Sequence, residues 1–182
     1  ISKIIPHEKV ETKAGVYVTA LEPDLLSAPT LAMAAVTKEL GQLGKQVLVI
    51  YRDSLPTLLS DDPKKLKILR NSDEEIDKMH DELIEYLTAL GRKQLSPEQQ
   101  DEQMRLVKMA DELEHIGDVL ETNISRLIEQ KQDSKVQFDS ESTKLLSEYH
   151  EMTLEALEKT VSALDSENNQ SVESVIGMKK KL

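Results

Sequence analysis

The chain has 182 residues, a formal net charge of −11, no cysteine and only 3% aromatic residues. The negative charge would repel a phosphate backbone, so nucleic acid is not an expected partner. The absence of cysteine excludes thiol chemistry and iron–sulfur ligation, and the sequence contains no apolar run of 18 residues that could span a membrane as a helix.

The first 27 residues have no helical periodicity, and we expect a linker with an extended stretch that packs on the following domain. Ser27, followed by Pro29, predicts an N-cap and a helix that continues to about residue 60. Apolar residues recur along this segment in steps of three and four, as on one face of an amphipathic helix: Leu40, Leu43, Val47 and Ile50.

Two more helix starts follow, and each combines a capping side chain with a proline. Asp62-Pro63 predicts a second helix that ends near residue 91. The segment 96–99, Ser-Pro-Glu-Gln, fits a capping box and predicts a third helix that ends near residue 130. The turn between these helices falls near Leu95 and Ser96, so the two should form an antiparallel hairpin.

Residues 130–138 form a polar connection, and Asp139 then starts a predicted fourth helix that ends near residue 164. Residues 167–182 form a further segment. Because 143–164 resembles the first helix in pattern, a weak internal repeat is indicated. We therefore predict an all-α antiparallel helical bundle. Its parts are a linker (1–27), a three-helix unit (28–131) and a partial second helical unit (132–182).

Two acidic motifs interrupt the apolar stripes of the predicted hairpin. Asp73 and Asp77 lie four residues apart in the second helix, and Glu114 and Asp118 lie four residues apart in the third. This spacing places each pair on one face of its helix. In the hairpin, Asp77 comes level with Glu114 and Asp73 with Asp118. The two rungs are roughly 6 Å apart, given a rise of 1.5 Å per residue.

Four converging carboxylates repel one another unless a cation lies among them, so this pattern predicts a site for a hard metal ion. No Lys or Arg occurs in either motif to neutralise it. Gly117, which is unfavourable inside a helix, indicates a close approach of the partner helix there. The default alternative is a plain helical interaction module whose acidic side chains form a solvated, solubilising surface.

A second alternative is a carboxylate-bridged di-iron enzyme of the ferritin-like type. Asp77 with His80, and Glu112 with His115, have the carboxylate-x-x-His spacing of such centres. Helical angles place Glu112 and His115 almost opposite the apolar stripe, which argues against this arrangement. No Gly-rich phosphate loop or Ser/His/Asp arrangement is present, and we do not expect an enzyme.

The acidic motifs, 73–79 and 110–118 followed by Asn123-Ile124, resemble the signature of the PhoU family of phosphate-transport regulators. The segment 21–33 is similar to the linker that leads into the PhoU-like cytoplasmic domain of bacterial sodium/phosphate cotransporters. His115 stands where the family usually has Arg, and the second half lacks an acidic pair, with Gly177 to Lys181 in its place. The resemblance therefore implies at most one complete site.

The resemblance also implies a function and a setting. The protein would be a soluble regulatory domain at the cytoplasmic face of the inner membrane, with the membrane transporter domain in the same polypeptide as its partner. The family's acidic motifs can hold multinuclear iron or other metals, which carries over here to Asp73, Asp77, Glu114 and Asp118. Phosphate could bind through the metal, and a homodimer is possible on this resemblance.

Overall fold

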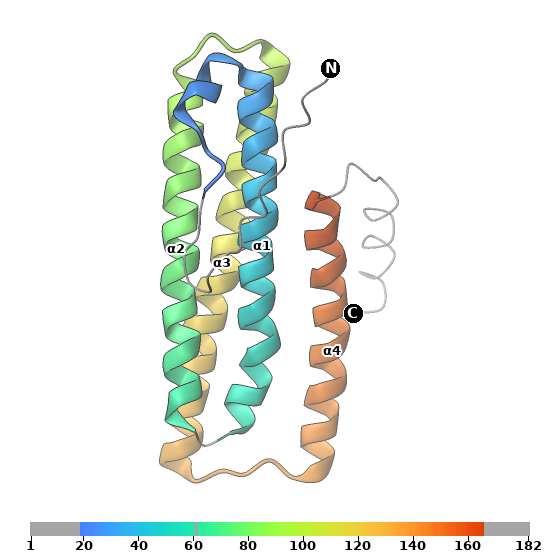
Figure 1. Ribbon diagram of the computed structural model, residues 1–182. Helices are drawn as coiled ribbons and strands as arrows, with labels where there is room; N and C mark the ends of the chain where they lie inside the picture. Colours follow the sequence, from blue (N-terminus) through green and yellow to red (C-terminus); the bar gives the residue numbers. More distant parts are fainter. Residues whose placement is uncertain (1–18, 61, 166–182) are drawn as a thin grey trace, which may run out of the picture.

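The computed structural model describes residues 19–60 and 62–165, and within them every regular element is helical (Figure 1). A short 3-10 helix, η1 (Pro23–Ser27), leads into α1 (Pro29–Leu59). Three further helices follow: α2 (Pro63–Gly91), α3 (Pro97–Ser134) and α4 (Ser140–Asp165). The predicted all-α bundle is confirmed. Helices α1, α2 and α3 pack together, while α4 lies beside α1 on the outside of this trio (Figure 1).

Three of the four predicted helix starts have the expected capping bonds. The carboxylate of Asp62 accepts a hydrogen bond from the Lys64 amide at 2.9 Å, and Ser96 and Gln99 form a complete capping box. Asp139 accepts from the Ser142 amide at 2.7 Å. These bonds satisfy amides that the first turn of a helix leaves without backbone partners.

The prediction of Ser27 as an N-cap is wrong. Its hydroxyl donates to the Asp24 carbonyl at 2.8 Å and completes η1, so Ala28 occupies the cap position without a side-chain bond. Pro29 at the first helical position has no N–H, which leaves one fewer donor for a cap to satisfy. The part of the predicted extended stretch before residue 19 and the segment 167–182 lie outside the described residues.

Helix α3 is one turn longer than the polar composition of residues 130–138 predicted. It ends at Ser134, and the following residue, Lys135, has a left-handed φ of 52° that breaks the helix. The ammonium group of Lys131 donates to the Leu58 and Leu59 carbonyls, at 3.2 and 3.1 Å, at the C-terminal end of α1. A cation at that position is favourable because the last carbonyls of a helix lack partners. This contact extends the packing of α3 to the lower end of the bundle in Figure 1.

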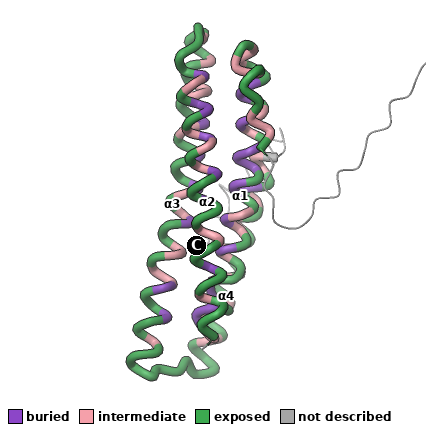
Figure 2. The backbone as a smooth tube through the Cα atoms, turned by 60° about the vertical axis from the view of Figure 1, so that its left-hand side comes forward, coloured by how far each residue is buried: buried purple, intermediate pink, exposed green. Residues whose placement is uncertain are grey.

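The main core runs along the axis of the α1–α3 trio. Figure 2 shows the buried positions as bands on the inward faces of the helices. The largest fully buried side chains include Leu40, Leu43, Val47 and Ile50 of α1. Those of α2 include Ile76, Leu83, Leu87 and Leu90. The apolar stripes predicted for these two helices are therefore the faces that pack.

Helix α4 adds a second contact face to α1. A Cβ built on Gly44 would meet the Val161 side chain at 2.9 Å, so this glycine lets the two helices approach closely. His150 stacks on Tyr51, with ring centroids 4.7 Å apart, and its Nε2 lies 2.8 Å from the Tyr51 carbonyl oxygen. In the described residues, no helix is long and apolar enough to cross a membrane.

Candidate metal site

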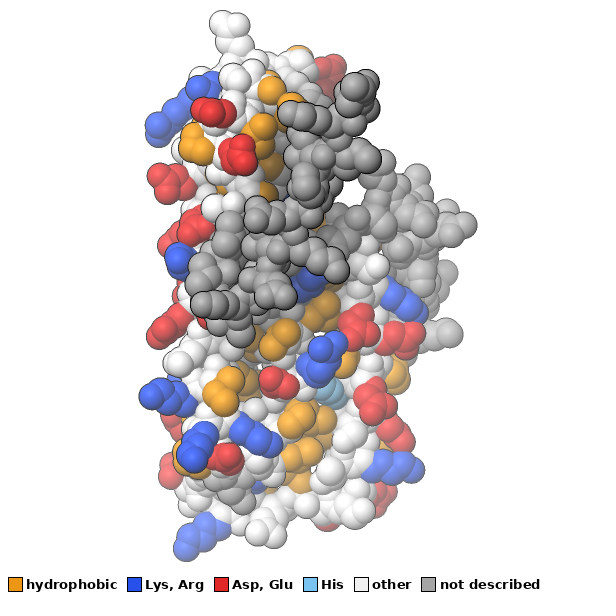
Figure 3. All heavy atoms as spheres, in the orientation of Figure 1, with side chains coloured by type: hydrophobic (Ala, Val, Ile, Leu, Met, Phe, Trp, Pro, Cys, Tyr) orange, Lys and Arg blue, Asp and Glu red, His pale blue; other side chains and the backbone are white. Residues whose placement is uncertain are grey.

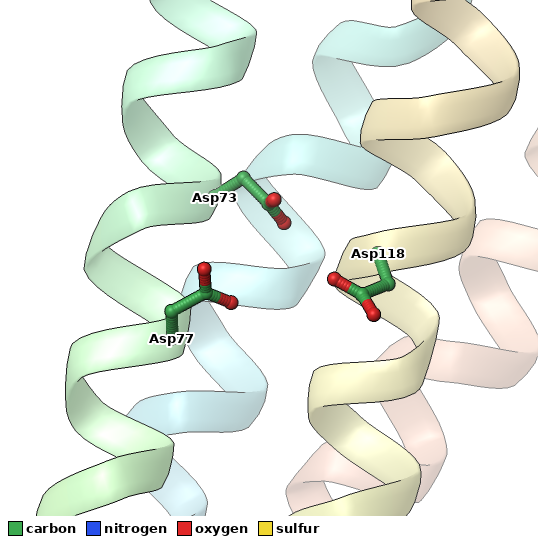
Figure 4. Close-up of side chains that lie close together, drawn as sticks. All are labelled: Asp73, Asp77 and Asp118. Carbon is green, nitrogen blue, oxygen red and sulfur yellow. The ribbon is translucent and has the colours of Figure 1, made fainter.

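Three acidic side chains converge on the seam between α2 and α3. Asp73 and Asp77 project from successive turns of α2 toward Asp118 of α3, while α1 lies behind them (Figure 4). One carboxylate oxygen from each residue lies within 4.8 Å of the other two. Asp73 is half-buried, and Asp77 and Asp118 are exposed. The cluster is therefore anchored in the seam and accessible from solvent.

Glu114, the fourth predicted ligand, lies outside this group of three. It is half-buried on α3, one turn before Asp118. Burial and the neighbouring Asp118 raise the pKa of the Glu114 carboxyl, and Asp77 adds to the increase. Glu114 therefore belongs to the same negative field, but its oxygens do not meet those of the three aspartates.

Gly117 determines how deeply Asp73 sits in the seam. A Cβ built on this glycine would lie 3.1 Å from Oδ1 of Asp73 and 3.2 Å from the Ile76 side chain. The close approach predicted from the sequence is thus present, and the group that fills the space is a carboxylate. That oxygen is buried and has no hydrogen-bond partner among the described residues. A buried carboxylate oxygen without a donor is energetically unfavourable, and a bound cation would relieve it.

Burial and the nearby negative charges raise the pKa values of Asp73 and Asp77. The pKa of Asp73 rises to about 6, first because the side chain is buried, then because Asp77 and Asp118 are nearby. Burial raises the pKa of Asp77 as well, and the negative charge of Asp118 adds to it. Each shift has the direction expected when like charges share a partly desolvated site without a cation.

Basic or histidine side chains pair with the acidic groups on both sides of the cluster. Toward one end of the seam, Arg70 of α2 contacts Glu121 at 3.2 Å and Glu129 at 3.1 Å. Toward the other end, Nε2 of His80 lies 2.9 Å from Oδ1 of Asp111. The sequence analysis missed both pairs, although they keep the same antiparallel register as the acidic motifs. The space between them has no Lys or Arg paired with the three aspartates in the described chain.

The ligand set of the di-iron alternative does not come together. Glu112 and His115 are exposed, as their helical angles predicted, and Glu112 lines a groove between α3 and α4. His80 is engaged with Asp111 on the opposite side of α3 from that groove. Among the described side chains, the one group of three or more potential ligands with converging atoms is the aspartate cluster.

The fold and the site define the class of protein: a helical bundle in which carboxylates converge on the seam between α2 and α3. Residues 40–128, from the middle of α1 almost to the end of α3, match the PhoU domain. This match confirms the resemblance to the PhoU family drawn from the acidic motifs. No solved structure gives a significant match to the chain.

The chain is also similar to proteins named "Putative inorganic phosphate export protein YjbB". The one from Salmonella typhimurium is 23% identical over 146 residues, which cover 80% of this chain and 27% of the relative. Those from Escherichia coli K12 and O157:H7 are 22% identical over 164 residues, 90% of this chain and 30% of each relative. The chain thus spans less than a third of the length of these relatives.

Proposed function

We propose that this chain is the regulatory domain of a phosphate transporter and that it binds a metal ion at the Asp73, Asp77 and Asp118 cluster. The observation that carries the metal site is the buried, unpartnered Asp73 oxygen beside two further carboxylates. Carboxylate oxygens suit hard cations, which bind them at roughly 2.0 to 2.6 Å, so opposed ligands lie about 4 to 5 Å apart. The 4.8 Å limit on the three oxygens fits this range.

The donor set favours Mg²⁺, Mn²⁺, Ca²⁺ or Fe³⁺, because only oxygen atoms are offered. A single ion would take the three aspartates. A multinuclear site would also recruit Glu114, whose pKa is raised by burial and by the neighbouring Asp118. Such an ion would supply positive charge at the solvent-facing side of the seam. Coordination positions not filled by protein oxygens could then be taken by phosphate, which is our proposed route for sensing it.

The transporter role is supported by the PhoU domain match and by the phosphate-export name that the relatives carry. Because each relative is more than three times as long as the matched region, we propose that the remaining length supplies the membrane part. A sodium-dependent phosphate cotransporter is the specific partner that we infer from the linker-like segment 21–33. The bundle would then act at the cytoplasmic face of the membrane.

Metal titration of the purified chain tests the site directly. Isothermal titration with Mn²⁺, and iron analysis after reconstitution with Fe³⁺, should show binding by the unmodified protein. Asp77→Asn combined with Asp118→Asn should weaken it at least about 100-fold, or about 2.7 kcal/mol. The matched control, Glu85→Gln with Glu112→Gln, removes the same charge from exposed positions on the same helices and should leave binding unchanged. Equal loss in both double variants would mean that only the general negative charge attracts the ion.

A further inference from the structure

The segment before α1 is held on the bundle by a buried glutamate. Glu39 of α1 is only 2% exposed and is the one charged residue among the buried positions of the described chain. Its Oε1 accepts a hydrogen bond from the Ala20 amide at 2.7 Å. A buried amide of an irregular segment needs such an acceptor, because no helix or strand supplies one. Glu39 therefore ties residue 20 to the middle of the trio.

A second polar contact holds the same segment from α2. The Tyr86 hydroxyl donates to the Glu22 carbonyl at 3.0 Å, and the Tyr86 ring is almost fully buried. Burial raises the pKa of this phenol, so the hydroxyl keeps its proton and remains a donor. Glu39 of α1 and Tyr86 of α2 thus hold residues 20 and 22 of the segment, one from each helix.

Apolar contacts complete the attachment, but they are few. Leu21, Leu25 and Leu26 pack on the core and remain partly exposed. A groove of about 350 Å³ separates the segment from α2, lined on one side by Thr19, Leu21, Pro23 and Leu26. A segment with a short apolar footprint and incomplete packing opens at lower free energy than the helices beneath it.

We propose that residues 19–27 form a reversible latch on the α1–α2 pair, held in place by hydrogen bonds with Glu39 and Tyr86. Docked, residues 19–27 lie against α1 and α2. Released, the ten residues 19–28 can span about 33 to 36 Å when fully extended. This inference rests on the proposed function in one respect: in a transporter's regulatory domain, latch release would set how far the bundle can move from the segment that tethers it.

The absence of cysteine from the whole chain allows a clean measurement of latch opening. An Ala20→Cys background adds only one heavy atom to the side chain and keeps the backbone amide that Glu39 binds. Its rate of reaction with a thiol-specific disulfide reagent reports how often the latch opens. Amide hydrogen exchange in α3, measured on the same samples, reports whether the bundle itself stays folded.

Four variants in this background test whether the hydrogen bonds of Glu39 and Tyr86 control how often the latch opens. Glu39→Ala removes the acceptor and should speed labelling at least about tenfold, while Tyr86→Phe removes one donor and should speed it about threefold. Glu39→Gln retains an acceptor and should stay close to the unmodified rate. Glu85→Ala deletes an exposed carboxylate from the rim of the same groove and should change nothing.

Equal labelling rates in Glu39→Ala, Tyr86→Phe and the Glu85→Ala control would overturn the latch. So would α3 exchange that rises in step with labelling, because Glu39 would then be a structural part of the bundle. If Glu39→Ala does not fold, Tyr86→Phe decides alone by the same two readouts. The measurement uses neither metal nor phosphate, so a failed metal titration leaves the latch standing, and a failed latch leaves the metal site standing.

Discussion

Two acidic regions of the α2–α3 seam differ in whether a basic side chain pairs with their carboxylates. Around Arg70, two glutamates of α3 pair with one guanidinium, which also reaches the buried Ser125 hydroxyl at 3.4 Å. A turn farther along α2, Asp73, Asp77 and Asp118 converge, and none of them pairs with a Lys or Arg among the described residues. One part of the seam thus pairs its acidic residues with a cationic side chain, and the aspartate cluster is where we propose that an external cation binds.

The surface gives the same contrast on a larger scale. Figure 3 shows acidic side chains spaced along the edge of the molecule where α2 lies, with basic side chains between them. On this face the negative charge is therefore dispersed and solvated, as expected for an acidic helical protein. The aspartate cluster differs because one of its oxygens is buried, so its charge cannot be screened by water alone.

Among the tests of this comparison, substitution of Gly117 should have the largest effect on the free energy of unfolding. Gly117→Val would force side-chain atoms into the space held by Asp73 and Ile76, and we expect a loss of about 2 kcal/mol in the free energy of unfolding. Chemical denaturation of the metal-free protein measures it. Gly117→Ala is the graded control, since its gain in helix propensity, about 1 kcal/mol, offsets the crowding of a single methyl group. Destabilisation as large in the alanine variant would mean that the seam cannot adjust at all.

The second test uses pH. Asp73 binds its proton more tightly in the folded than in the unfolded chain, because its folded pKa of about 6 exceeds the ordinary 3.8. The metal-free protein should therefore lose stability as pH rises from about 4 to 6, and stay lower above that range. Because the side chain is partly exposed, we expect no more than about 1 kcal/mol.

Asp73→Asn is the reference for that measurement. It removes the titrating group, so the difference in unfolding free energy between this variant and the unmodified protein should be near zero at pH 4 and favour the variant at pH 7. With saturating Mn²⁺, the unmodified protein should instead gain stability as pH rises, because protons and metal compete for the same oxygens. A difference that is constant across this pH range would show that Asp73 does not titrate as described.

The smallest effect on stability should come from the region in which Arg70 pairs with two glutamates. Arg70→Gln leaves Glu121 and Glu129 without their cation, and we expect a loss of about 0.5 kcal/mol because the three side chains are partly solvated. Thermal unfolding at low and at 0.5 M salt should show the loss shrinking as salt screens the charges. A stabilised Arg70→Gln variant would contradict the contrast drawn between the two regions.

The sequence predicted the parts of this fold that depend on local patterns. Asp62, Ser96 and Asp139 were found because a capping side chain acts on amides only two or three residues away. Asp73 and Asp118 could be paired because a short turn fixes the register of an antiparallel hairpin. Gly117 could be read as a close approach because its cost inside a helix needs a compensating contact.

What the sequence did not predict depends on contacts between distant elements. Glu39 lies among apolar positions of α1, and nothing near it in the sequence indicates that it binds Ala20. Glu114 was expected to come level with Asp77 in the hairpin, yet its side chain does not place an oxygen among those of the aspartates. Lys131 lies in the added turn of α3 and donates to a carbonyl at the end of α1. This contact can be recognised only once the two helices are packed together.

The short α2–α3 connection, residues 92–96, also has a consequence for how the chain folds. Helices joined so closely can pair before either meets α1, since closing a short loop costs little entropy. The aspartates then come together early, and their repulsion opposes a step that precedes formation of the core. We therefore expect protonation or a bound cation to act on the folding rate: the ion that a finished site would hold also removes a barrier to building it.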